Sequence, residues 1–142
     1  MPPIAPPRDS AGIVVPHNHE DILASHYVIR HTTPNDLVTD ADTGERRISS
    51  GAYSESSDGG MSVDIEDWMI HDGIAALHYV IEPSHGATRI NVGALRALGF
   101  QVGWDPKISN PHHGAVWGLT NSKRRTKVFK LAKLLRKAEG EA

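Results

Sequence analysis

Turn residues and prolines divide this chain into short segments, and this punctuation limits the fold more than any other feature. Segments 25–32, 61–65, 100–104 and 115–119 are rich in β-branched and aromatic residues, which is typical of β-strands. Between them lie stretches such as 54–60, whose serines, aspartate and glycines are typical of loops. We therefore expect several short, mostly antiparallel strands.

The C-terminal segment has a different pattern. Its apolar residues follow helical i, i+3, i+4, i+7 spacing, and Asn121 or Ser122 precedes it as a capping residue. The apolar positions are Val128, Leu131, Ala132 and Leu135. This pattern predicts a long basic helix over 123–137 that packs on one face of the strands, which gives an α+β fold.

Other segments give weaker indications. Residues 91–98 predict a short helix with Asn91 as its cap, and residues 65–70 predict another. Residues 47–53 are compatible with a returning strand. The apolar run 75–81 is compatible with either a buried strand or a short helix, because its periodicity does not separate the two.

The length and composition indicate one globular domain. The chain has 142 residues, of which 39% are apolar, and it has no cysteine, which excludes disulfides and thiolate metal sites. Four prolines in residues 1–10 predict an extended arm over 1–11, followed by a single α+β domain over 12–142. No apolar run is long enough to cross a membrane, and we expect a cytoplasmic protein, located in the host cytoplasm or the virion if a phage encodes it.

Charge is distributed very unevenly along the chain. Residues 1–122 carry seven Lys/Arg and fifteen Asp/Glu, a formal charge of −8, whereas residues 123–142 carry eight Lys/Arg and two Asp/Glu, a formal charge of +6. A basic end beside an acidic body predicts that this end contacts a polyanion or docks on the body itself. The candidate binding residues are Lys123, Arg124, Arg125, Lys127 and Lys130.

These cations have two interpretations. They could contact the phosphates of nucleic acid or an acidic protein surface, or they could form an ordinary solvated helix face. Cations in the first helical turn oppose the helix dipole, so the dipole alone does not explain Lys123, Arg124 and Arg125. Aromatic residues do not alternate with them, and a stacking platform for single strands is not indicated.

Three residues are candidates for catalysis if the protein is an enzyme, which the sequence leaves undecided. His112 would act as the general acid or base, while Arg47 and Ser50 would hold a phosphate group. The alternative for His112 is a structural hydrogen bond in the loop over 105–113. No nucleophile elbow of the Gly-x-Ser-x-Gly type is present.

The sequence does not predict a metal site, and it leaves any cofactor unknown. His112 and His113 lack the spacing that would pair them with other histidines on a helix. Residues 40–45 resemble the start of a calcium loop, but Gly51 stands at the twelfth position, where such a loop needs glutamate. A hairpin turn is the simpler interpretation of this segment.

Several stretches together resemble a group of small uncharacterised bacterial and phage proteins. The chain shares with them Arg47 followed by a Ser-Ser-x-Ala-aromatic order, a Met-Ser-Val-Asp step ending at Asp64, and Asp-Pro followed by Asn110-Pro111-His112. The resemblance covers roughly residues 27–135, and the chain departs from it at His113, where a small residue is expected. It implies no activity, but it suggests that six polar residues converge on one groove or brace the loops: Arg47, Ser49, Ser50, Asp64, Asn110 and His112.

Three functional hypotheses follow. The first is a non-catalytic accessory or binding protein whose basic C-terminal end contacts nucleic acid or an acidic protein surface. The second is a small enzyme that acts on a nucleotide or phosphodiester through His112, Arg47 and Ser50. The third is a virion or assembly protein whose arm lies across a neighbouring copy, which implies a homo-oligomer.

Overall fold

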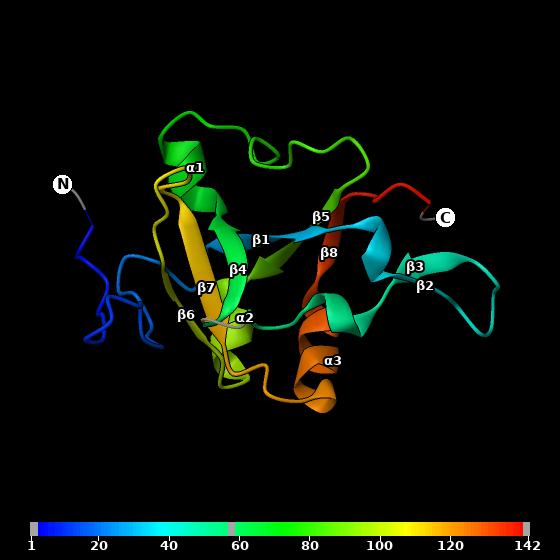
Figure 1. Cartoon of the computed structure of the whole chain (residues 1–142), viewed down its shortest axis with the longest axis horizontal. Helices are drawn as coiled ribbons and strands as arrows, with labels where there is room; N and C mark the ends of the chain where they lie inside the picture. The colour runs from blue at the N-terminus through cyan, green and yellow to red at the C-terminus, as the bar shows by residue number, and fades with distance from the viewer. Residues whose placement is uncertain (1–2, 57–58, 141–142) are drawn as a thin grey trace.

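A single antiparallel sheet organises the molecule. The computed structural model describes residues 3–56 and 59–140, and within them six strands pair in the order β6-β7-β4-β1-β5-β8 (Figure 1). Every neighbouring pair in this sheet is antiparallel. The strands are β1 (Tyr27–Thr32), β4 (Met61–Ile65), β5 (Gly86–Asn91), β6 (Gln101–Trp104), β7 (His113–Trp117) and β8 (Lys133–Arg136).

A hairpin and short helices complete the fold. The hairpin pairs β2 (Leu37–Thr39) with β3 (Arg46–Ile48), and the α-helices are α1 (Glu66–His71), α2 (Val92–Ala97) and α3 (Ser122–Leu131). Two 3-10 turns, η1 (Pro34–Asp36) and η2 (Ser50–Ala52), flank the hairpin. None of the helices in this described part of the chain combines the length and the apolar character that crossing a membrane requires.

The main core lies on one face of the sheet. Alternate residues of the central strands, such as Val28, Ile65 and Ile90, are fully buried on this face. Leu95 from α2 and Val128 from α3 pack against them. The helices therefore cover this face, and burial of α3 through Val128 fixes which side of that helix points outward.

Two small apolar clusters lie on the opposite face of the sheet. Ile29 and Ala87 pack against Val80 from the loop that precedes β5, and at the other end Ala115 and Trp117 pack against Val14. The N-terminal segment makes a second contact at Ile4, whose carbonyl oxygen lies 2.7 Å from Nε2 of His19. The sheet thus keeps polar side chains on this face between its two apolar covers.

The structure confirms the α+β class and several predicted elements. β4 covers the predicted segment 61–65, and β1, β6 and β7 overlap the other three predicted strands. Asn91 caps α2 by accepting a hydrogen bond from the amide of Ala94 at 2.8 Å. These elements form where local preference and tertiary packing agree.

The long basic C-terminal helix is a wrong prediction. α3 ends at Leu131, Ala132 is extended with φ −70° and ψ 138°, and the chain continues as β8. β8 pairs with β5, and Leu135 packs on the Ile29 cluster while Leu134 remains 48% exposed. The apolar residues of this segment also fit the period of a helix. If the helix continued, however, the backbone N–H and C=O groups along the edge of β5 would lack partners, and pairing with β8 provides them.

Two further segments differ from expectation. Only Arg46–Ile48 is a strand in the returning segment, because the chain then tightens into η2, where Ser49 accepts a hydrogen bond from the amide of Gly51. Residues 75–81 form neither a strand nor a helix, and they cross the sheet as turns. Residues 40–45 form the hairpin turn between β2 and β3, with Gly44 at φ 73°.

Candidate functional site

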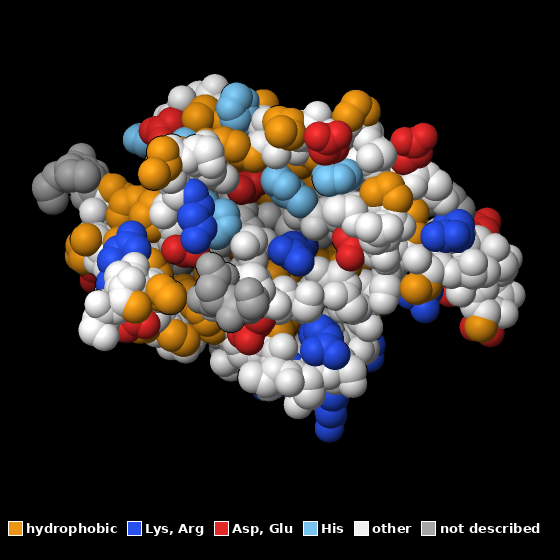
Figure 2. All heavy atoms as spheres, in the orientation of Figure 1, with side chains coloured by type: hydrophobic (Ala, Val, Ile, Leu, Met, Phe, Trp, Pro, Cys, Tyr) orange, Lys and Arg blue, Asp and Glu red, His pale blue; other side chains and the backbone are white. Residues whose placement is uncertain are grey.

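Lysines follow one exposed line along α3. Lys123, Lys127 and Lys130 stand at i, i+4 and i+7, opposite the side that buries Val128. We call these three residues the lysine stripe. Within residues 3–56 and 59–140, none of the three has an acidic partner or a hydrogen bond from its side chain. In the space-filling view, Lys and Arg side chains lie at this end of the molecule and also elsewhere on the visible face (Figure 2).

Arg124 and Arg125, the two arginines among the predicted binding residues, are less exposed than the lysines. Arg124 turns inward, where its Nε donates to the carbonyl of Gly118 and its guanidinium lies 4.4 Å from the centre of the Phe100 ring. This contact braces the loop before α3. Arg125 is half-buried and stands off the line of the lysine stripe.

Arg47 and Ser50 lie beside α3. Arg47 donates through Nε to Asp40 at 2.9 Å, and its guanidinium lies 5.8 Å from the centre of the Phe129 ring on α3. Ser50 opens η2, which packs against α3. The two predicted phosphate-holding residues therefore share a neighbourhood with the basic helix.

His112 lies in a different network. The ring is 5% exposed, its Nε2 lies 2.6 Å from Oδ2 of Asp72, and its Nδ1 lies 2.8 Å from the hydroxyl of Tyr79. Neither Arg47 nor Ser50 has a hydrogen bond or ion pair with this group in the described residues. A hydroxyl, an imidazole and a carboxylate in series can pass or hold a proton.

Tyr79 stays protonated in this arrangement. Partial burial raises the pKa of the Tyr79 hydroxyl above its usual value, and the negative charges of Asp64 and Asp72 raise it further. The protonated hydroxyl can donate a hydrogen bond to Nδ1 of His112.

A second buried acid joins the network through Asn110. Asp64, 3% exposed, accepts from Nδ2 of Asn110 at 2.8 Å and lies 2.6 Å from Nε2 of His31. Oδ1 of Asn110 accepts from the backbone amide of His112 at 2.9 Å. The C-terminal ends of β4 and β1 and the loop before β7 thus meet on the face of the sheet opposite the core.

The structure brings together half of the six polar residues that the resemblance singles out. Asp64, Asn110 and His112 converge, whereas Arg47, Ser49 and Ser50 lie at the hairpin and η2. Sequence reasoning missed Tyr79, because it lies in the apolar run 75–81. No signal in that run distinguishes a tyrosine that donates to a histidine from one that fills a core.

Beside His112 lies a hollow of about 840 Å³. We call it the acidic hollow. Its lining contains four carboxylate residues, three histidines and two tryptophans, and it contains no Lys or Arg. The four carboxylate residues are Glu20, Asp21, Asp67 and Asp72.

These surroundings oppose a phosphate substrate at His112. A phosphodiester in the acidic hollow would face carboxylates, while the guanidinium of Arg47 is engaged at the hairpin with Asp40. We therefore do not assign phosphodiester chemistry to the trio of His112, Arg47 and Ser50.

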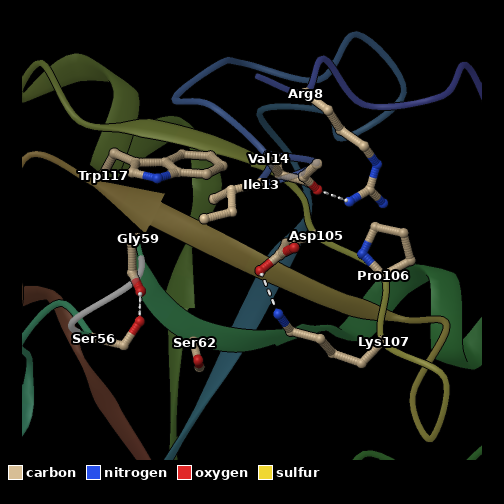
Figure 3. A pocket seen from close by; sticks show the side chains of 12 residues that line it. Arg8, Ile13, Val14, Ser56, Gly59, Ser62, Asp105, Pro106, Lys107 and Trp117 are labelled. Atoms are coloured by element: carbon tan, nitrogen blue, oxygen red, sulfur yellow. Dashed lines mark hydrogen bonds and ion pairs between the residues drawn. The ribbon is translucent and has the colours of Figure 1, made fainter. Parts of the chain in front are cut away.

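A smaller hollow of about 140 Å³ lies where the N-terminal segment approaches β4 and the end of β6 (Figure 3). Its two cations are engaged, since Arg8 donates to the carbonyl of Gly12 at 2.8 Å and Lys107 pairs with Asp105 at 3.2 Å. Ser62 of β4 also lines it. Asp105 balances the charge of Lys107, whereas the carbonyl that Arg8 contacts is neutral.

The histidines do not converge on a metal. His31 contacts Asp64, and the ring of His17 contacts the carbonyl of Val15 and the amide of Trp104. Within the described residues, no three His, Asp or Glu side chains are grouped so that they could hold a metal ion.

The comparisons with known proteins add no relative. No protein-family model, curated protein or solved structure matches the chain. Functional inference therefore depends on the chemistry of the surface itself.

Proposed function

We propose that this protein binds nucleic acid through the lysine stripe of α3. The proposed role is that of a non-catalytic accessory protein, of bacterial or phage origin as the resemblance implies. Such a partner would be met in the cytoplasm, or in the virion if a phage encodes the chain. An acidic protein surface is the alternative partner, and the experiment below separates the two.

The observation that carries this proposal is that the lysine stripe has no acidic partner. The body of the protein is acidic, yet in the described residues its carboxylates pair with Arg47, Arg89, Lys107 and histidines. Three exposed, unpaired lysines on one helix face are the electrostatic footprint expected of a phosphate-binding surface.

The spacing of the lysines suits a phosphate backbone. Seven residues of helix rise by roughly 10 Å, and phosphates follow one another about every 3.4 Å along each strand of a duplex. Three phosphates can therefore be neutralised at once. The logarithm of the affinity is then expected to fall with the logarithm of salt concentration with a slope of about −2.7, or roughly 40-fold between 50 and 200 mM salt.

The test is fluorescence anisotropy of the full chain with labelled duplex DNA and duplex RNA at several salt concentrations. The triple variant Lys123→Gln, Lys127→Gln and Lys130→Gln is expected to weaken binding at low salt by at least tenfold and to flatten the salt slope towards zero. Binding to a labelled polyglutamate chain, with none to either duplex, would assign the stripe to an acidic protein partner instead.

A matched triple variant controls for net charge. Arg8→Gln, Arg46→Gln and Lys107→Gln removes three exposed cations elsewhere and is expected to change the salt slope only slightly. If both triple variants weaken binding equally, net charge rather than the stripe is responsible. If the wild-type chain does not bind at low salt, the proposal fails.

A further inference from the structure

The acidic hollow has two aromatic walls set at an angle. The ring centres of Trp68 and Trp104 lie 5.4 Å apart with an interplanar angle of 68°, and the buried His19 ring lies edge-on to both at 5.4 and 5.9 Å. His19 thus packs against both tryptophans, which together form an angled corner. The hollow, about 840 Å³, lies within the range of small-molecule sites.

The polar atoms of this corner are already satisfied. The indole N–H of Trp68 donates to the carbonyl of Asp21 at 3.1 Å, and that of Trp104 donates to the carbonyl of Pro111 at 2.9 Å. What the tryptophans offer a ligand is therefore their ring surface, which attracts a cation.

The carboxylates of the hollow are only partly neutralised by the protein. Asp72 is held by His112 and Asp67 accepts the amide of Tyr27 at 2.8 Å, whereas the carboxylates of Glu20 and Asp21 have no partner in the described residues. No Lys or Arg lines the hollow. Negative charge beside tryptophan rings in one open hollow is complementary to an organic cation rather than to an anion.

We propose that the acidic hollow binds a small organic cation that carries a guanidinium or alkylammonium group. The cationic group lies against the corner of Trp68 and Trp104, and Glu20 and Asp21 balance its charge. The described residues provide no grouped set of metal ligands, which a metal ion would need. This site is independent of the proposed nucleic-acid contact: the hollow borders α1, which lies at the opposite end of the view from α3 (Figure 1).

The test is calorimetric titration of the full chain with agmatine, which carries both cationic groups. We expect saturable 1:1 binding, no binding of the neutral analogue N-butylurea, and about fivefold weaker binding in the double variant Glu20→Gln and Asp21→Asn. This double variant changes exposed side chains without changing their shape, so it is expected to fold. The matched control Asp42→Asn and Glu45→Gln removes two exposed charges at the hairpin and is expected to bind agmatine almost as wild type.

Tryptophan emission gives a second readout at the site. The chain has three tryptophans, and Trp117→Phe removes the one outside the hollow, so that the remaining emission comes from Trp68 and Trp104. Agmatine is expected to change this emission with the calorimetric affinity. Trp104→Leu is expected to weaken binding about tenfold.

The same titration with a blocked pentapeptide that contains one arginine shows whether the natural ligand is a free amine or an arginine of a protein chain. The site fits whichever of agmatine and the peptide binds with the higher affinity. Absence of agmatine binding at millimolar concentration would overturn the proposal. So would equal binding by the wild type and the Glu20→Gln and Asp21→Asn variant. The lysine-stripe triple variant is expected to retain agmatine binding, so failure of either site is distinguishable from failure of the other.

Discussion

At the scale of single residues, Asn110 connects two parts of the network. Its amide nitrogen donates to the buried carboxylate of Asp64, and its amide oxygen accepts from the backbone of His112. Because the side chain is 8% exposed, water does not readily replace either bond. Asn110 therefore fixes the loop before β7 against β4 and determines where His112 lies.

Replacing Asn110 with alanine is expected to lower the free energy of unfolding by about 2 kcal/mol, because it leaves the Asp64 carboxylate and the His112 amide short of partners. Urea denaturation followed by circular dichroism measures this loss. Asn35→Ala, at an exposed position of η1, is the matched control and is expected to change stability by less than about 0.5 kcal/mol. Equal stability of the two variants would mean that the buried bonds contribute nothing.

The hairpin carboxylate of Asp40 gives a pH-dependent prediction. The amides of Asp42 and Thr43 donate to it and Arg47 pairs with it, and these contacts hold the pKa of Asp40 below its ordinary value of 3.8. The folded hairpin therefore binds this proton less readily than the unfolded chain. Asp40 contributes stability above its ordinary pKa, and this contribution is lost as the pH falls through the lowered folded pKa.

NMR measurement of the Asp42 and Thr43 amide shifts against pH tests this directly. We expect a midpoint below 3.8, and a higher midpoint in Arg47→Gln, which removes one of the stabilising contacts. A wild-type midpoint at or above 3.8 would contradict the hydrogen-bonded geometry of the turn.

At the scale of secondary-structure elements, α3 depends on its cap. It has no acidic residue in its first turn and begins with cations that oppose the helix dipole. Asn121 compensates by accepting the amide of Arg124 at 2.9 Å through its side chain. The cap and the burial of Val128 hold a helix of ten residues, a length that is marginal in isolation.

Asn121→Ala is expected to lower the free energy of unfolding by about 1 kcal/mol, because the amide of Arg124 loses its acceptor. Thermal unfolding monitored by circular dichroism measures the change. Ser122→Ala, one residue later and with no side-chain contact in the described residues, is the comparison and is expected to be close to neutral. A larger loss in Ser122→Ala would move the cap to that residue, the other candidate in the sequence.

The boundary between α3 and β8 shows why the end of a secondary-structure element is hard to predict from local sequence. Leu131, Ala132 and Leu135 satisfy a helical period, and nothing in residues 123–137 marks a break, since neither Gly nor Pro occurs there. The break at Ala132 exists because β5 offers an unpaired edge, which is a property of the assembled sheet.

At the scale of the whole molecule, the fold places the lysine stripe and the acidic hollow on different elements. The lysine stripe lies on α3, and the carboxylates of the acidic hollow lie on α1, just after it and in the segment before β1; Figure 1 shows where these elements lie. α3 packs on the body through Val128, yet the lysines of the stripe do not pair with these acids in the described residues. Their separation allows the protein to present a cation-rich surface and a cation-binding hollow at the same time.

Local patterns in the sequence determined much of this architecture. The α+β class, the strand over 61–65, the cap at Asn91 and the hairpin turn follow from alternation, capping chemistry and turn residues that act over a few positions. The uneven charge is likewise a property of the sequence alone.

Only the tertiary structure decided which side chains meet. His112 lies 33 residues from Tyr79 and 40 from Asp72, and Trp68 and Trp104 form a corner across 36 residues of sequence. Such contacts depend on the order of strands in the sheet and on the path of the covering loops. Short-range patterns do not encode these, because the free energy that selects them comes from burying the assembled core.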